Sequence, residues 1–438
     1  MSSSPQVAVE EPAEPSPGAL RPILVLVIGT GIRWFGLSFY VVFILLFLHN
    51  DLHLSYILAG LIITVIGVGT VPLGQIGGGL SDRVGRRRMI VLSLAGESTG
   101  LALLAWGFSL DSLLVILGAI LLSRSFAVTG SPSTYAYIAD SLGDKLRARG
   151  LSWLRVAVNL GTFGGISVAG VLLTFISFGQ LTALAALLVG AAATVNGIWL
   201  VPTARDLALK AKEPGSTRPT AAPSPSPLRW VGQTIYSSFR PIWSDRSLPL
   251  VMLASILMLL MLIQYAYAIP TFSHSVLGVP YPIVGAAVSL SGLIPVLTQV
   301  PTTKALSGRL LTRVGIWGAL AYGASYLAFG LDATYRVELI PALFAMVIVI
   351  TLAENLVFLP IFTLPLNIAP ENARGSYSGT ITMVNAFGNN LGALFAGVAL
   401  TYASQPLVTW GILAAPAIPA ILILAYLGSR ISQSQNRV

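Results

Sequence analysis

Four ionisable side chains lie deep inside long apolar runs of this 438-residue chain: Arg33, Glu97, Arg124 and Glu354. A charge in the hydrocarbon core of a membrane costs several kcal/mol, so such residues are paired, hydrated or functional. At about 1.5 Å of rise per residue, the two arginines lie near the middle of a bilayer. A desolvated carboxyl group holds its proton, and a neighbouring guanidinium favours its release. These residue types therefore indicate a proton or anion site.

A structural interpretation of the same four residues is also open. Two arginines and two glutamates could form two neutral ion pairs that only hold helices together. For Arg124 and Glu354 we favour the functional interpretation, a proton or anion site. For Glu97 we favour the structural interpretation, and Arg33 stands between the two.

The composition of the chain indicates that these residues are surrounded by a membrane and not by water. Hydrophobic residues make up 55% of the chain and charged residues 9%, whereas a soluble chain has about 25% charged residues. Apolar runs of about 20 residues recur along the whole length. The predicted fold class is an all-α integral membrane protein with twelve transmembrane helices. Its predicted parts are a disordered tail (1–21), a six-helix bundle (22–201), a linker (202–246), a second six-helix bundle (247–429) and a second tail (430–438).

The basic residues predict the orientation of the chain. Apart from Arg33, Arg124 and Arg336, the 25 Lys and Arg residues fall in the two tails and the even-numbered loops. Under the positive-inside rule both termini are cytoplasmic. We expect the chain to cross the cytoplasmic membrane. The net charge of +9 is thus a topology signal, and we expect no nucleic-acid partner.

Several kinds of chemistry have no support in the sequence. The chain has no cysteine, which excludes disulfides and thiolate ligands. It has no nucleotide-binding glycine loop and no convincing catalytic or metal cluster, so we expect neither an enzyme, nor a cofactor, nor a metal site. His49 and His53 have a spacing that could bind a metal on a helix, but we expect them to lie in a solvated loop.

Four pairs of segments indicate an internal repeat. The pairs are "SYILAG" (55–60) with "PYPIVG" (280–285), "GGLSDRVG" (78–85) with "GRLLTRVG" (308–315), "RARG" (147–150) with "NARG" (372–375), and "SVAGVLL" (167–173) with "LFAGVAL" (394–400). The four pairs occur in the same order in both halves, which predicts two parallel six-helix halves with a site at their interface. On this alignment Thr312 replaces Asp82, and Arg124 and Glu354 occupy equivalent positions from which they could meet.

The segment "GGLSDRVGRR" (78–87) resembles the loop signature of the major facilitator superfamily. The resemblance implies a monomeric secondary transporter, embedded in the lipid bilayer, whose two halves rock around a small-molecule substrate and a proton or other ion. It also implies a conformational latch on the cytoplasmic side, in which Asp82 would contact the start of the eleventh span near 375–376 and Arg86 would pair with a carboxylate ending the fourth span. The latch residues are Gly78, Asp82, Arg83, Gly85, Arg86 and Asp140.

Gly78 of this latch, together with Gly79, would allow two backbones to approach closely, and Gly85 would allow a turn with positive φ. Amphipathic and aromatic residues on the same spans are candidates for the substrate cavity: Trp34, Phe35, Tyr40, Gln264, Tyr265, Asn355, Asn385 and Asn389.

The predicted function is proton-coupled export of small amphipathic compounds by alternating access. One alternative is an uptake permease for a sugar or organic anion, with Arg33 and Arg124 as an anion clamp. A second alternative is a membrane scaffold that transports nothing.

Overall fold

The computed structural model describes residues 17–142, 144–211 and 247–438. Most of the predicted first tail and of the linker therefore lies outside the described residues. The first helix begins at Pro17, earlier than the predicted boundary at residue 22. Proline suits the first position of a helix, because the backbone N–H that it lacks would have no partner there.

Twelve described segments are long and apolar enough to cross a membrane, as predicted. Those before the linker are built from α1 (Pro17–Val41), α2 (Ile44–Asn50), α3 (Tyr56–Val84), α4 (Arg86–Ser109), α5 (Leu113–Ser141), α6 (Asp144–Leu172) and α7 (Phe178–Trp199), and a short α8 (Ala204–Ala211) follows. In a bilayer every backbone polar group needs an internal partner, which the hydrogen bonds within a helix provide.

The second half repeats this order. Its helices are α10 (Leu248–Leu262), η1 (Ile263–Tyr265), α11 (Ala268–Thr271), η2 (Phe272–Val276), α12 (Tyr281–Leu306), α13 (Leu311–Tyr335), α14 (Leu339–Ile368), η3 (Glu371–Ala373), α15 (Arg374–Leu400), α16 (Pro406–Ala414) and α17 (Ala417–Arg430). The first span of each half is interrupted, between α1 and α2 and between η1 and α11. The interruptions fall at corresponding places, as expected for a duplicated unit.

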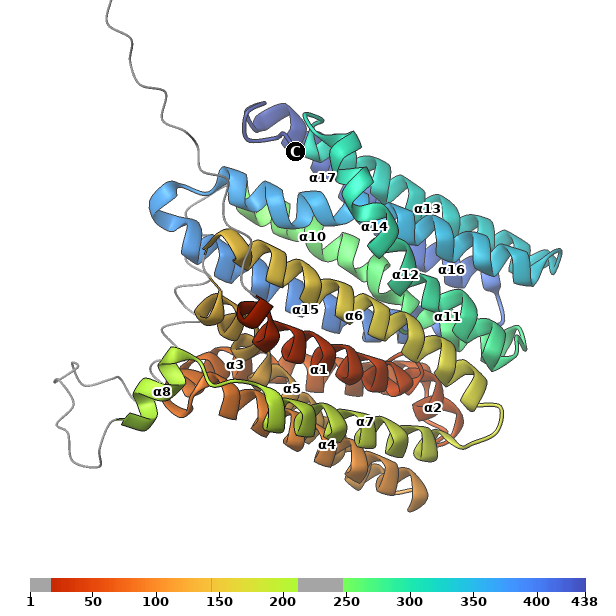
Figure 1. Cartoon of the computed structure of the whole chain (residues 1–438). Helices are drawn as coiled ribbons and strands as arrows, with labels where there is room; N and C mark the ends of the chain where they lie inside the picture. The colour runs from red at the N-terminus through yellow and green to blue at the C-terminus, as the bar shows by residue number, and fades with distance from the viewer. Residues whose placement is uncertain (1–16, 143, 212–246) are drawn as a thin grey trace, which may run out of the picture.

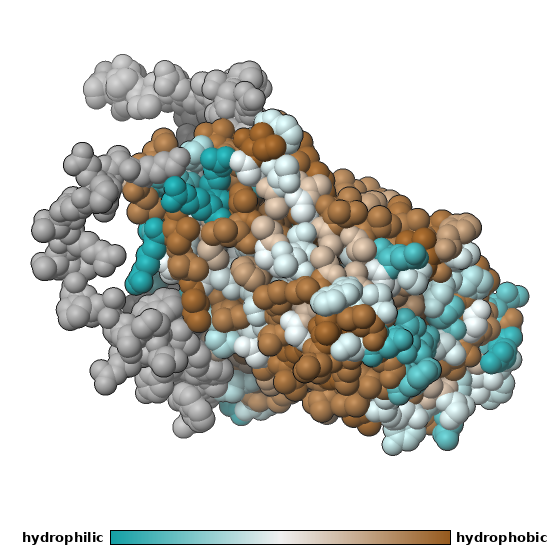
Figure 2. All heavy atoms as spheres, turned by 90° about the horizontal axis from the view of Figure 1, so that it is seen from below, coloured by the Kyte–Doolittle hydropathy of each residue, from teal (hydrophilic) through white to brown (hydrophobic). Residues whose placement is uncertain are grey.

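The helices run side by side, so the bundle has two ends (Figure 1). We call the end that carries Gly85 and α8 the basic end, and the end that carries α2 and α11 the far end. Large apolar side chains are exposed between the ends, for example Val65 at 61%, Leu187 at 69% and Leu422 at 65%. Figure 2 shows one such face, with hydrophobic residues over broad areas and hydrophilic residues gathered toward the ends. This surface suits a hydrocarbon solvent.

Two helix pairs join the halves: α3 packs against α15, and α6 packs against α12. A Cβ added to Gly60 of α3 would collide with the backbone oxygen of Ala393, and one added to Gly285 of α12 would lie 2.9 Å from that of Ile166. Gly397 of α15 approaches Tyr56 of α3 in the same way. We call these two helix contacts the seams.

A glycine of α6 completes the correspondence. A Cβ on Gly170 of α6 would lie 2.6 Å from the backbone oxygen of Tyr281. These glycines and tyrosines belong to two of the four repeated segment pairs. Because α3 and α12 begin at the far end, their first turns bring the halves into contact there.

A polar residue caps the third span of each half. Asp206 accepts hydrogen bonds from the backbone N–H groups of Arg86 (2.6 Å) and Arg87 (3.4 Å) at the start of α4. Asn436 accepts one from the backbone N–H of Thr312 (3.0 Å) at the start of α13. Thr312 therefore begins a helix, whereas Asp82 lies in the last turn of α3. The expected correspondence of Thr312 with Asp82 is wrong, because the similar letters "TRVG" and "DRVG" lie on opposite sides of the interhelical turn.

Candidate functional site

Arg33 of α1 and Glu97 of α4 form an ion pair inside the first half. The Arg33 Nε atom lies 2.6 Å from Glu97 Oε2, and Nη2 lies 2.9 Å from Oε1. The Glu97 side chain is 2% exposed and that of Arg33 is 20% exposed. Two parallel hydrogen bonds are the strongest arrangement of an arginine and a carboxylate. The pair removes most of the cost of each buried charge.

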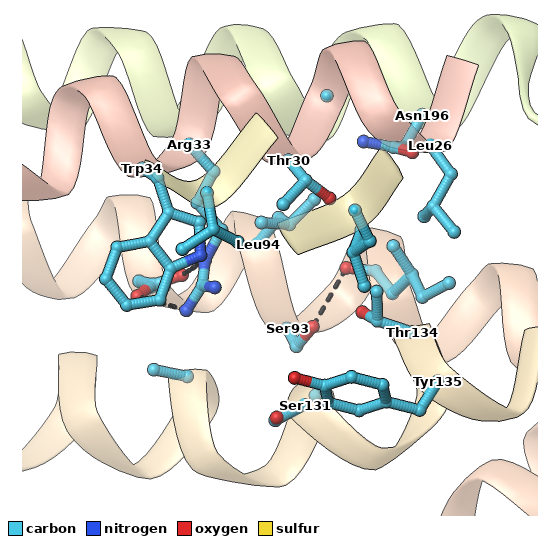
Figure 3. Close-up of a pocket in the computed structure, with 17 residues that line it drawn as sticks. Leu26, Thr30, Arg33, Trp34, Ser93, Leu94, Ser131, Thr134, Tyr135 and Asn196 are labelled. Carbon is cyan, nitrogen blue, oxygen red and sulfur yellow. Dashed lines mark hydrogen bonds and ion pairs between the residues drawn. The ribbon is translucent and has the colours of Figure 1, made fainter. Parts of the chain in front are cut away.

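A polar cavity of about 140 Å³ adjoins this ion pair (Figure 3). The cavity is lined by five helices of the first half, and Asn196 of α7 borders it near the basic end. The Asn196 Oδ1 atom is buried and has no hydrogen-bond partner among the described residues. Hydroxyl groups of Thr30, Ser93 and Thr134 also face the cavity. A space of this size has room for a few water molecules.

Arg124 of α5 makes a contact that crosses between the halves. Its Nη2 atom donates to Oδ1 of Asn390 on α15, at 3.2 Å. The Asn390 backbone oxygen accepts from the Thr64 hydroxyl of α3 at 2.8 Å, and that hydroxyl accepts from the backbone N–H of Leu394 at 3.1 Å. The missing side chain of Gly67 leaves room for the Asn390 amide. Arg124 is thus tied to the α3–α15 seam.

Glu354 does not meet Arg124 in this structure. No ion pair of Glu354 occurs among the residues that the structure describes, and the charge that acts on it is that of Arg155 on α6. The Arg155 guanidinium lies 5.5 Å from the centre of the Phe358 ring, one turn along α14 from Glu354. This second approach between the halves therefore brings a cation of the first half toward a carboxylate of the second.

The helix bounds explain why Arg124 and Glu354 are not equivalent. Arg124 is the twelfth residue of α5, and Glu354 is the sixteenth residue of α14. Because α5 and α14 are corresponding helices, the two side chains differ by about one helical turn in depth. Near the far end, corresponding residues of the two halves are separated by fewer residues than Arg124 and Glu354 are. The sequence alignment did not resolve this difference.

The structure divides the predicted cavity residues of α1 and η1 into two groups. Trp34 lines the cavity beside Arg33, whose guanidinium carbon lies 5.7 Å from its ring centre. Tyr40 is buried within the electrostatic reach of Arg124, and the half-buried Tyr265 lies within that of Glu354. These aromatic residues lie beside the charged groups, whereas Phe35 packs against Phe39.

The predicted amide residues serve mainly to pack helices of the second half. Gln264 is fully buried and donates to the backbone oxygens of Leu260 and Gly392. Asn355 donates to the Thr298 hydroxyl at 2.8 Å. The buried Asn385 amide has no partner among the described residues.

Asn389 is half-buried, and it is its neighbour Asn390 that contacts Arg124. Successive helical residues point about 100° apart, so only one of two adjacent asparagines can face the seam. The signal that could have selected Asn390 is Gly67, which lies opposite it on α3.

The predicted latch residues form a charge network within the first half. Arg86 lies 2.7 Å from Asp82 and 3.0 Å from Asp140, and it also donates to the Ser81 hydroxyl. Arg205 of α8 lies 3.1 Å from Asp82. The expected Arg86–Asp140 pair is present, while the Asp82 partners are in its own half. The role of this network as a latch stays a prediction, as does that of the exposed Arg83.

The two glycines of this motif behave differently. Gly85 has φ of 103°, as the predicted turn requires. Gly78 makes no close approach, because a Cβ there would lie 3.9 Å from the nearest atom, in Pro132. The close helix contact is instead at Gly77, where a Cβ would collide with the Thr129 backbone of α5. The expectation for Gly78 is therefore wrong by one residue.

Comparisons with known proteins agree with this architecture. The family model of the Major Facilitator Superfamily matches residues 26–393, so the chain belongs to that superfamily of membrane transporters. Multidrug resistance protein 1 of Bacillus subtilis (strain 168) is 30% identical over 125 residues. That match covers 28% of this chain and 31% of the length of that relative.

Solved structures of similar fold include transporters with several kinds of substrate. A peptide transporter in complex with sulfate has a TM-score of 0.74 at 17% identity, covering 94% of this chain and 95% of that one. The nucleoside transporter NupG has a TM-score of 0.72 at 14% identity, covering 94% and 100%. A human organic anion transporter has a TM-score of 0.62 at 17% identity, covering 93% and 100%. At such identities the likeness shows the fold alone.

Proposed function

We propose that this chain exports small amphipathic compounds across the cytoplasmic membrane, driven by protons that enter as the substrate leaves. The observation that carries the proposal is the Arg124–Asn390 hydrogen bond, a charged contact that joins the halves inside the membrane. Rocking of the halves would break or remake it. A cation that changes partner with conformation is suited to change the protonation of carboxyl groups around it.

Two carboxyl groups are the proton carriers in this proposal. Glu354 faces the other half across from Arg155 and has no fixed ion pair among the described residues. Glu97 is paired with Arg33, and the polar cavity gives that pair a hydrated route toward the basic end. We propose that the basic end is cytoplasmic, because it carries most of the basic loops.

The partial similarity to a multidrug resistance protein supports export of amphipathic compounds. The uptake alternative needs Arg33 and Arg124 as a joint anion clamp. Glu97 already neutralises Arg33, which leaves Arg124 as the one of these two arginines whose charge is not compensated and makes a clamp less favourable. Proposed partners are therefore one small amphipathic molecule, protons and the bilayer, with the chain acting as a monomer.

The test uses purified protein in liposomes with a pH gradient. A panel of amphipathic dyes is first screened by thermal shift for binding, and bound dyes are then followed for uphill transport. Glu354→Gln should abolish uphill transport and retain dye exchange, because glutamine resembles the protonated carboxyl group. Glu338→Gln, at the exposed N-cap of the same helix, is the matched control.

Uphill transport by Glu354→Gln at the wild-type rate would rule out Glu354 as carrier. Dye transport that follows the dye gradient alone, and that persists when the pH gradient is removed, would contradict proton coupling. Absence of any flux in the wild type, with binding intact, would favour the scaffold alternative.

A further inference from the structure

Two histidine–tyrosine pairs at the far end have nearly the same geometry in the two halves. His49 Nδ1 lies 2.7 Å from the backbone oxygen of Leu54, and the His49 ring stacks on Tyr56 with centroids 3.7 Å apart. In the other half, His274 Nδ1 lies 3.0 Å from the backbone oxygen of Val279. The His274 ring stacks on Tyr281 at 3.6 Å.

Each histidine joins the end of one span to the start of the next. A carbonyl oxygen only accepts hydrogen bonds, so each Nδ1 atom carries the proton and donates it. The connecting loops bend through one left-handed residue each, His53 with φ of 52° and Gly278 with φ of 72°. A short loop with such a bend has few alternative shapes once both of its ends are fixed. We call each histidine, with its carbonyl and its tyrosine, a brace.

The braces position the residues that form the seams. The backbone oxygen of Tyr56 abuts Gly397 of the second half, and that of Tyr281 abuts Gly170 of the first half. The Tyr281 ring also lies 6.1 Å from the Phe47 ring of α2. Each braced tyrosine therefore contacts the opposite half with its backbone, and Tyr281 does so with its ring as well.

A hydrogen bond beside the two braces joins the halves directly. The residue after each histidine takes part: the Ser275 hydroxyl donates to the Asn50 side-chain oxygen at 3.3 Å. Corresponding residues of two repeats can contact each other only near the pseudo-twofold axis that relates the repeats. The two braces therefore flank this axis at the far end, where the halves must part if that end opens.

We propose that His49 and His274 are positioning residues of a gate at the far end, each holding its tyrosine against the opposite half so that this end stays closed. The proposal rests on the alternating access of the superfamily and involves neither protons nor substrate. Loss of either brace would leave the fold intact but weaken the closed state of the far end. Rocking of the two halves as rigid bodies would then bring them together at the basic end as the far end opens.

The experiment measures distances between spin labels in purified, substrate-free protein by double electron–electron resonance. The chain has no cysteine, so paired cysteines are the only label sites. Thr174→Cys with Ser404→Cys reports on the far end, and Ala148→Cys with Ala305→Cys reports on the basic end; all four residues are exposed. One pH is used throughout, because burial and the neighbouring Asp111 raise the pKa of Asp51, which titrates at this end.

His49→Phe and His274→Phe keep an aromatic ring and remove the N–H donor. Loss of one hydrogen bond should reduce the ratio of far-end-closed to far-end-open molecules about fivefold, and loss of both about 25-fold. The far-end distance should lengthen while the basic-end distance shortens. His49→Gln, which keeps a donor, should recover much of the closed state.

His53→Asn is the matched control, since asparagine tolerates a left-handed backbone and His53 makes no hydrogen bond among the described contacts. Unchanged distances in both Phe variants would overturn the proposal. So would a shift at only one end, or opposite shifts for the two histidines. If a Phe variant fails to fold, the proposal requires wild-type label distances in His49→Gln and changed label distances in His49→Ala. Failure would leave the export proposal untouched, because no substrate or pH gradient is used.

Discussion

The two ends of the bundle show how differently a duplicated chain can diverge. At the far end the halves keep matching parts: Gly60 and Gly285 in the seams, and His49 and His274 in the braces. At the basic end they differ. In the first half Arg86 bridges two aspartates, whereas α13 of the second half begins under the neutral cap of Asn436.

The difference follows from what each end must do. Backbones in close contact tolerate only glycine, so the far-end seams retained their small residues in both halves. The charged network at the basic end depends on side chains, which can be lost from one half without disturbing the packing of the other. We infer that closure of the far end is a symmetric packing event and closure of the basic end an asymmetric electrostatic one.

The largest expected effect on transport is at the seams. Gly60→Leu places a side chain where even a Cβ would collide with the α15 backbone, so transport should be lost and stability should fall by about 1–3 kcal/mol. Gly69→Leu on the same helix is the control, because a Cβ there meets nothing within 4 Å. Dye flux measures transport, and thermal unfolding measures stability, in both variants. Equal activity of the two variants would contradict a packed far end.

The next effect on transport, and the largest on stability, concerns the buried ion pair. Glu97→Gln strands the Arg33 charge and should cost about 3–5 kcal/mol of stability. The double variant Arg33→Met with Glu97→Met should be much closer to the wild type in stability yet still fail to couple protons to transport. Chemical denaturation and proton uptake measure the two properties. Full proton coupling in the double variant would mean that the Arg33–Glu97 pair has only a structural role.

A smaller effect is expected at the contact between Arg124 and Asn390. Arg124→Gln and Asn390→Ala should each weaken the α3–α15 seam, and a double-mutant cycle should give a coupling of about 1 kcal/mol. The labelled far-end pair should report a greater open population in each variant. Strictly additive effects would mean that the 3.2 Å contact contributes nothing.

The smallest effect on stability is expected at Asp82, which is 46% exposed. Exposed ion pairs contribute at most about 1 kcal/mol, so Asp82→Asn should fold normally. If the network closes the basic end in another conformation, cysteine cross-linking between the α3–α4 turn and the start of α15 should fall in this variant. Unchanged cross-linking would remove the latch hypothesis.

The sequence was sufficient to predict the twelve spans, the two halves and the presence of charges inside the membrane. Hydrophobic length and motif order carry that information directly. It did not place side chains: Arg33 meets Glu97, and Arg124 meets Asn390 rather than Glu354. Partner choice depends on helix rotation and depth, and an error of one residue turns a side chain by about 100°. That error separates Asn389 from Asn390 and Gly78 from Gly77.

The central claim is that the halves part at the far end during each transport cycle. Asn50→Cys with Ser275→Cys, whose native side chains touch across the halves, gives the most direct test in this cysteine-free chain. Oxidation should form a disulfide and stop dye transport in proteoliposomes, and a reductant should restore it, while each single cysteine stays active throughout. Transport at the wild-type rate with the disulfide quantitatively formed would contradict the claim.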